Sequence, residues 1–141
     1  MSNAEQPQRA NVELARTALE TYRSGDTEAL RSLIDPEAEV TSDPLGMNSG
    51  VYKGFEGYLK WLGQWLEAWE EFEIEVEKIE PIGERHVVVD VRQFGLGKGS
   101  GVPVDQRISQ MWEIRDGRII RFHLYPDHPQ ARAAAELGEQ E

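Results

Sequence analysis

The sequence contains no cysteine and no apolar run long enough to cross a membrane. The lack of thiols excludes disulfide bonds and cysteine nucleophiles, and it suits a reducing compartment. A membrane-spanning helix needs roughly 18 or more consecutive apolar residues, which occur nowhere in the chain. The N-terminus shows no basic segment followed by an apolar one, so no secretion signal is evident. We therefore expect a cytoplasmic protein.

Positive charge is also scarce. The chain has 15 Lys and Arg against 26 Asp and Glu, which gives a formal net charge of −11. Nucleic acids and anionic membranes are bound through clustered cations, so we expect neither of them as a partner. The negative surplus is explained by solubility alone.

The 141 residues are enough for one domain. Hydrophobic residues make up 39% of the chain, and four Trp, four Tyr and four Phe can anchor a core. Residues 1–9 are polar and are expected to form a disordered tail, part of which resembles a remnant of cloning. We expect residues 10–138 to form a single domain.

Apolar residues at helical spacing predict three helices in the first half of the chain. The first covers residues 11–25, with Asn11 as its N-cap and Gly25 as its stop. The second is short and covers residues 26–35, with Asp26 or Thr27 as its cap.

The third predicted helix covers residues 54–72 and carries a tryptophan stripe. Trp61, Trp65 and Trp69 are spaced four apart, so they lie along one side of the helix. Such a stripe is explained either by core packing or by the aromatic wall of a ligand pocket. Both explanations hold if the helix covers a cavity.

The second half of the chain predicts long antiparallel strands. Residues 70–83 alternate apolar residues with glutamates, and residues 85–94 form a second strand. The glycine-rich segment 95–103 lacks the spacing of a phosphate-binding loop, and we interpret it as a hairpin loop. A run of helices followed by a run of strands indicates an α+β fold.

The clearest hairpin turns at Asp116-Gly117. A regular two-residue turn would pair Met111 with Phe122 and Ser109 with Leu124, and would pair Gln110 with His123. One face of the hairpin would then be apolar and the other aromatic and polar. We expect helices to cover one face and a second subunit to cover the other.

From about residue 10 to residue 138 the sequence resembles the nuclear-transport-factor-2-like superfamily, in particular its SnoaL-like and ketosteroid-isomerase-like branches. The resemblance rests on a helix ending in "SGD", an "EVTSDPLG" strand, a glycine-led helix and "IRDGRIIRFHLYPD". It implies a cone-shaped half-barrel, in which a curved, mostly antiparallel sheet wraps around three N-terminal helices and encloses a pocket. It also implies a homodimer through the convex sheet face.

The resemblance implies a role for Asp43. In ketosteroid isomerases a similar turn carries the aspartate that moves a proton, and Asp43 falls on that position. A carboxylate surrounded by apolar walls is a better base, because burial disfavours its charged form. The alternative is a carboxylate that hydrogen-bonds its own turn.

The sequence also departs from these relatives. Ala18 and Ser109 stand where the isomerases have their oxyanion-binding tyrosine and second acid, and Leu124 replaces an acid of the limonene-epoxide hydrolases. Ser109 can still donate a hydrogen bond, but it is a weaker donor than a protonated acid. These departures disfavour true steroid isomerisation and epoxide hydrolysis.

We therefore predict a pocket for a mostly apolar, ring-containing small molecule, with Asp43 as a base for isomerase-like or cyclase-like proton transfer. This chemistry needs no cofactor and no metal. The alternatives are a non-catalytic binding protein and a dimerisation module whose tryptophans fill the core. The predicted ligand-binding residues are Thr41, Tyr58, Trp61, Leu62, Trp65, Ser109, Met111, Phe122 and Leu124.

The other polar residues have structural interpretations. Asp90 and Arg92 lie on one face of a strand and suggest an ion pair. We expect His123 at the subunit interface, bonded to Gln110, and we expect His86 to be exposed. His123, Asp127 and His128 match no strong zinc spacing.

Overall fold

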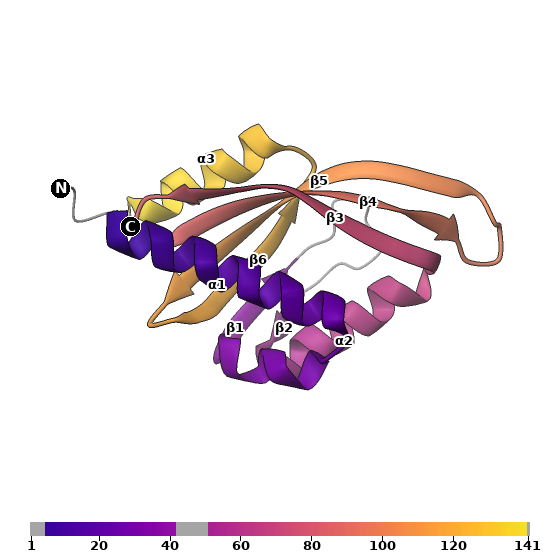
Figure 1. The fold of residues 1–141 in the computed structure, drawn as a ribbon, viewed down its shortest axis with the longest axis horizontal. Helices are drawn as coiled ribbons and strands as arrows, with labels where there is room; N and C mark the ends of the chain where they lie inside the picture. The colour runs from indigo at the N-terminus through magenta and orange to yellow at the C-terminus, as the bar shows by residue number, and fades with distance from the viewer. Residues whose placement is uncertain (1–4, 42–50, 141) are drawn as a thin grey trace.

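A computed structural model describes residues 5–41 and 51–140, and Figure 1 shows its fold. The elements, in chain order, are α1 Glu5–Ser24, the 3₁₀ helix η1 Thr27–Leu33, β1 Ile34–Thr41, β2 Val51–Lys53, α2 Gly54–Glu67, β3 Trp69–Ile82, β4 His86–Gly97, β5 Pro103–Arg115, β6 Arg118–Tyr125 and α3 His128–Glu139.

The described strands form one curved sheet in the order β2-β1-β6-β5-β4-β3. All neighbours are antiparallel except β1 and β6, which run parallel. Helices α1 and α2 lie on one side of the sheet and α3 lies on the other (Figure 1). The α+β half-barrel predicted from the sequence is confirmed.

Strand β4 is buried on both faces. Val87, Val89 and Val91 pack toward α1 and α2, whereas Val88 packs toward α3, and all four are fully buried. A strand covered on both faces is expected to be a continuous apolar run rather than an alternating one, as "HVVVDV" is. This strand is the centre of both cores.

The helices begin and end differently from the prediction. Helix α1 begins at Glu5, so it includes residues that the sequence placed in a disordered tail. Asn11 is not an N-cap: it is buried within α1 and donates from Nδ2 to the Glu84 carbonyl at 2.8 Å. The second helix is 3₁₀, and Asp26 caps it by accepting from the Ala29 amide. Trp69 belongs to β3, not to α2.

A β-bulge changes the predicted hairpin register. Asp116 and Gly117 both have positive φ, at 52° and 74°, as the predicted tight turn requires. Ile114 pairs with Ile119, but the bulge then leaves Ile120 without a partner. The pairing is shifted by one residue beyond this point, and a one-residue shift exchanges the two faces of a strand.

The observed pairs beyond the bulge are therefore not those predicted. Met111 pairs with His123 rather than Phe122, and Ser109 pairs with Tyr125 rather than Leu124. The side chains of β5 that face α1 and α2 include Ile108, Gln110, Trp112 and Ile114, each paired or packed on that side of the sheet.

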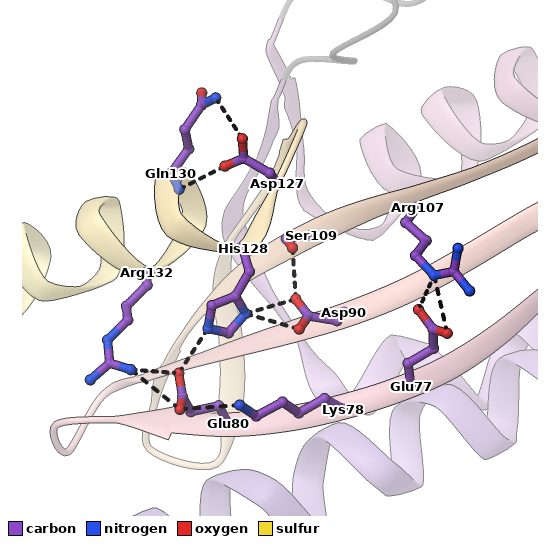
Figure 2. Close-up of polar contacts among 10 residues, drawn as sticks. All are labelled: Glu77, Lys78, Glu80, Asp90, Arg107, Ser109, Asp127, His128, Gln130 and Arg132. Carbon is purple, nitrogen blue, oxygen red and sulfur yellow. Dashed lines mark hydrogen bonds and ion pairs between the residues drawn. The ribbon is translucent and has the colours of Figure 1, made fainter.

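The start of α3 is held on the sheet by a histidine between two carboxylates (Figure 2). His128 Nδ1 lies 2.9 Å from the carboxylate oxygens of Asp90, and its Nε2 lies 3.1 Å from Glu80 Oε1. The Ser109 hydroxyl donates to Asp90 at 2.6 Å, and Arg132 pairs with Glu80. This arrangement is no nucleophilic triad, because the serine proton goes to the aspartate and not to the histidine.

The predicted pair of Asp90 and Arg92 is not formed. Arg92 instead makes a bidentate ion pair with Asp105, with Nε–Oδ1 at 2.9 Å and Nη2–Oδ2 at 2.6 Å. Asp90 is engaged by α3, as described above.

The end of α3 is held by Glu139. Its carboxylate accepts hydrogen bonds from the backbone amides of Glu84 and Arg85, both at 2.9 Å, and from His86 Nδ1. Burial raises the pKa of Glu139, but the bonds from His86 and the two amides outweigh burial and lower it. His86 is fully buried, so the prediction that it is exposed was wrong.

Glu139→Gln tests this anchor. A carboxyl whose pKa is lowered by folding contributes stability above its unfolded pKa, near 4.5, and loses it as the pH falls through the folded value. We expect the substitution to lower the free energy of unfolding by about 1–3 kcal/mol at neutral pH. Urea unfolding should show that this difference shrinks as the pH falls well below 4.5.

Glu136→Gln is the matched control. Glu136 lies on the same helix and makes only an exposed ion pair with Arg132, so its loss should change stability by less than about 0.5 kcal/mol. Equal effects of the two substitutions, or a Glu139→Gln effect independent of pH, would contradict the anchoring role.

Candidate functional site

A cavity lies between the helices and the sheet, on the face opposite α3. Its free space is about 80 Å³. Aromatic side chains dominate its wall: Tyr22 from α1, Tyr58, Trp61 and Trp65 from α2, Trp112 from β5 and Phe122 from β6. This volume holds water or a small chemical group, whereas pockets for drug-sized ligands begin near 300 Å³. A ring-containing ligand therefore requires some of these side chains to move.

The aromatic residues of α2 form a continuous stack. The ring centroids of Tyr58 and Trp61, and those of Trp61 and Trp65, are each 6.3 Å apart. Phe122 meets Trp61 edge to face at 5.5 Å, which connects the helix to the sheet. Trp61 and Trp65 are 5% and 2% exposed. The stripe thus belongs to the core and also forms a cavity wall, so both explanations of it apply.

Two buried amides lie in the sheet wall. Gln93 on β4 and Gln110 on β5 are 3% and 6% exposed, and both line the cavity. Gln93 Oε1 accepts from Gln106, its partner across the strands, at 3.3 Å. Gln110 Oε1 accepts from Trp112 Nε1 at 3.0 Å. A cavity with aromatic walls and a few fixed polar groups is typical of small-molecule sites.

Two tyrosines also line the cavity. Burial raises the pKa of Tyr58 far above its ordinary value, and the neighbouring Tyr22 raises it further. Burial raises the pKa of Tyr22 as well. Both phenols therefore stay protonated at neutral pH and act as hydrogen-bond donors rather than as bases.

Five of the predicted ligand-binding residues line the cavity: Tyr58, Trp61, Leu62, Trp65 and Phe122. Binding itself remains a prediction for them.

The other four predicted ligand-binding residues, which are Ser109, Met111, Leu124 and Thr41, do not line the cavity. Ser109 and Met111 face α3, because the bulge turns them away from the cavity: Ser109 donates to Asp90 and Met111 packs with Ala131 and Ala135. Leu124 is 2% exposed and buried in the core beside the cavity wall, without lining it.

Thr41 is at the end of β1 and hydrogen-bonds the ring of His123 on β6. The sequence predicted a hydrogen bond between His123 and Gln110. In the structure His123 contacts Thr41 instead. Burial lowers the pKa of His123, with a smaller contribution from Arg121. Asp43, the predicted base, lies outside the described residues.

Gln93, Gln110, Trp112 and Tyr22 were not predicted as site residues. Gln93 is in phase with Val89 and Val91, so the alternation of β4 carried the signal that it faces inward. Gln110 and Trp112 carried no such signal, since their orientation depends on the bulge.

Charged and metal-binding groups are sparse around the cavity. Of the described residues that line it, Glu39 is the one carboxylate, and it is half-buried. Over residues 5–41 and 51–140 no group of three His, Asp or Glu side chains is placed to hold a metal ion. No helix in these two ranges is long and apolar enough to span a bilayer.

Solved structures share this fold. TerC, co-crystallised with polyporic acid, is 19% identical and has a TM-score of 0.71, with 90% of this chain and 98% of TerC covered. A putative SnoaL-like polyketide cyclase from Jannaschia sp. CCS1 is 20% identical, with a TM-score of 0.72 and 96% of each chain covered. A nuclear-transport-factor-2-like protein from Burkholderia thailandensis is 18% identical, with a TM-score of 0.74 over 89% of this chain and 95% of that one.

The sequence comparisons agree with the fold. No curated protein matches the chain significantly. The model of the SnoaL-like domain family matches residues 15–122, which include the helices and strands that wall the cavity. The chain therefore belongs to the SnoaL-like domain family.

Proposed function

We propose that this protein binds a small, mostly apolar, ring-containing molecule in the cavity between α2 and the sheet. The observation that carries the proposal is the cavity itself, in which stacked aromatic rings surround two buried amides. A buried amide group that is left unsatisfied costs about 1–3 kcal/mol, so a ligand that pairs with such a group offsets this cost. TerC, a relative in fold, has been crystallised with a small molecule, which supports the same use here.

Filling the cavity tests this proposal. Ala18 on α1 is 4% exposed and lines the free space, so Ala18→Leu places a branched side chain inside it. We expect about 0.5–2 kcal/mol of added stability, as for other cavity-filling changes. We also expect the variant to lose binding of cyclohexanone, a minimal ring probe, as followed by the tryptophan indole signals in NMR spectra.

Ala10→Leu makes the same change at an exposed position of α1 and should leave probe binding intact. If Ala18→Leu bound cyclohexanone as the unchanged protein does, the ligand would lie elsewhere and the cavity would not be the site.

A second candidate function is proton transfer next to a carbonyl group, with Asp43 as the base. Strand β1 forms part of the cavity wall through Ala38 and Val40, and Asp43 follows Val40 by three residues in the sequence. The fold is shared with a protein named as a putative polyketide cyclase. A carboxylate is a sufficient base for such chemistry, and no cofactor is needed.

Asp43→Asn separates catalysis from binding. If Asp43 is the base, the protein should accelerate deuterium exchange at the carbon next to the cyclohexanone carbonyl. General-base catalysis typically contributes about 10²–10⁴-fold, so the variant should lose acceleration of about this size. Proton NMR in D₂O measures the exchange.

Asp116→Asn is the control, because Asp116 is exposed in the hairpin turn and asparagine tolerates its positive φ. A bound ketone whose exchange is no faster than in buffer would leave a non-catalytic binding protein. Accelerated exchange that is equally fast with Asp43→Asn would show that Asp43 is not the base.

The homodimer through the sheet face stays a prediction. Helix α3 covers part of that face, and a partner would pack on the remainder, where Arg121, His123 and Tyr125 are at least partly exposed. Sedimentation velocity should give twice the mass of one chain. A monomer at high micromolar concentration would contradict it.

A further inference from the structure

We infer that Gln110 determines the specificity of the cavity, and that its amide N–H groups select ring-containing ligands that carry a carbonyl oxygen. This inference rests on the proposed function, since it names the chemical class that the same cavity takes.

The orientation of the Gln110 amide is fixed by its neighbour. Its Oε1 lies 3.0 Å from Trp112 Nε1. An indole N–H only donates, so the atom that faces it must be the amide oxygen and not the nitrogen. The nitrogen, with its two N–H donors, is the free end of the side chain.

These donors have no acceptor in the described part of the chain, and the nitrogen is not fully enclosed by protein atoms, so it borders free space. Gln110 is 6% exposed, and within the part of the chain that the structure describes its nitrogen makes no hydrogen bond. Its neighbours across the strands are Val89 on β4 and Leu124 on β6, which offer no acceptor side chain. The side chain lines the cavity, so a molecule inside the cavity can supply the acceptor, and a ligand that does so takes the place of water.

Gln93 does not have the same role. Its Oε1 accepts from Gln106, and its own nitrogen has no acceptor in the described part of the chain. An amide such as that of Gln106 can both donate and accept, so it does not fix which end of Gln93 faces the cavity, whereas the Trp112 indole fixes the orientation of Gln110. The two buried glutamines therefore differ in orientation: of the two, Gln110 is the one whose nitrogen end is fixed by a neighbour that only donates.

The ligand chemistry follows from these constraints. The wall around Gln110 is aromatic, so a ligand must be largely apolar, and the amide requires one acceptor that points toward β5. A carbonyl oxygen accepts through two lone pairs and has no proton of its own to leave unsatisfied in an apolar wall, unlike a hydroxyl group. A ring ketone meets both conditions.

The test compares cyclohexanone with methylenecyclohexane, which replaces the carbonyl oxygen by a CH₂ group on the same ring. We expect the ketone to bind about tenfold more tightly, since a tenfold preference is the free energy of roughly one good hydrogen bond. We also expect the ketone, but not the hydrocarbon, to shift the NMR signals of the Gln110 side-chain N–H groups in the unaltered protein.

Gln110→Met keeps the length of the side chain and removes the donors, so it should abolish the preference. Gln6→Met makes the same change at an exposed position of α1, outside the cavity wall, and should retain it. If Gln110→Met does not fold, the shift of the Gln110 side-chain N–H signals in the unaltered protein still shows whether Gln110 contacts the ketone.

The outcomes separate the two proposals. If both probes bind equally and the Gln110 signals do not move, the inference about Gln110 is wrong and the proposed function stands. If neither probe moves any signal of the cavity wall, the proposed function is wrong and the inference falls with it.

Discussion

The chemistry of the cavity depends on one irregularity, the β-bulge that leaves Ile120 unpaired between β5 and β6. A shift of one residue exchanges the faces of a strand. The bulge therefore determines which alternate side chains of β5 face the helices α1 and α2. With the bulge, Gln110 and Trp112 line the cavity wall, and Ser109 and Met111 face α3. In a regular hairpin the same sequence would have formed a different cavity wall and a different packing surface for α3.

The two faces of the sheet then serve separate purposes. On the α3 face, polar groups are paired: His128 lies between Asp90 and Glu80 (Figure 2). At the far end of α3, Glu139 accepts hydrogen bonds from the turn before β4. On the other face the described wall is aromatic, with a few amide and phenol groups. A hydrogen bond in such surroundings is stronger than in water, and an unmade one is more costly. In the ligand-bound state that we propose, the Gln110 amide would orient a ligand that the apolar wall alone would bind in any direction.

Much of the fold was predictable because local chemistry specifies it. The Asp116-Gly117 turn, the alternation of residues 70–83 and the tryptophan spacing of α2 each require only neighbours in sequence. The bulge was not predictable, because nothing in "EIRDGRIIRF" separates a regular hairpin from a bulged one. The burial of His86 was missed for a related reason: its partner Glu139 lies 53 residues away. Site residues on α2 were therefore identified, and those on β5 were assigned to the wrong face.

The orientation of β5 is the claim on which the cavity, its amide and the seat of α3 all rest. Nuclear Overhauser contacts between assigned side chains measure it directly. We expect contacts between the rings of Trp112 and Phe122, whose centroids are 5.9 Å apart, and between the Met111 methyl group and Ala131 or Ala135. Contacts of Met111 with Phe122, together with contacts of Trp112 with Ala131, would show the regular hairpin and contradict this account.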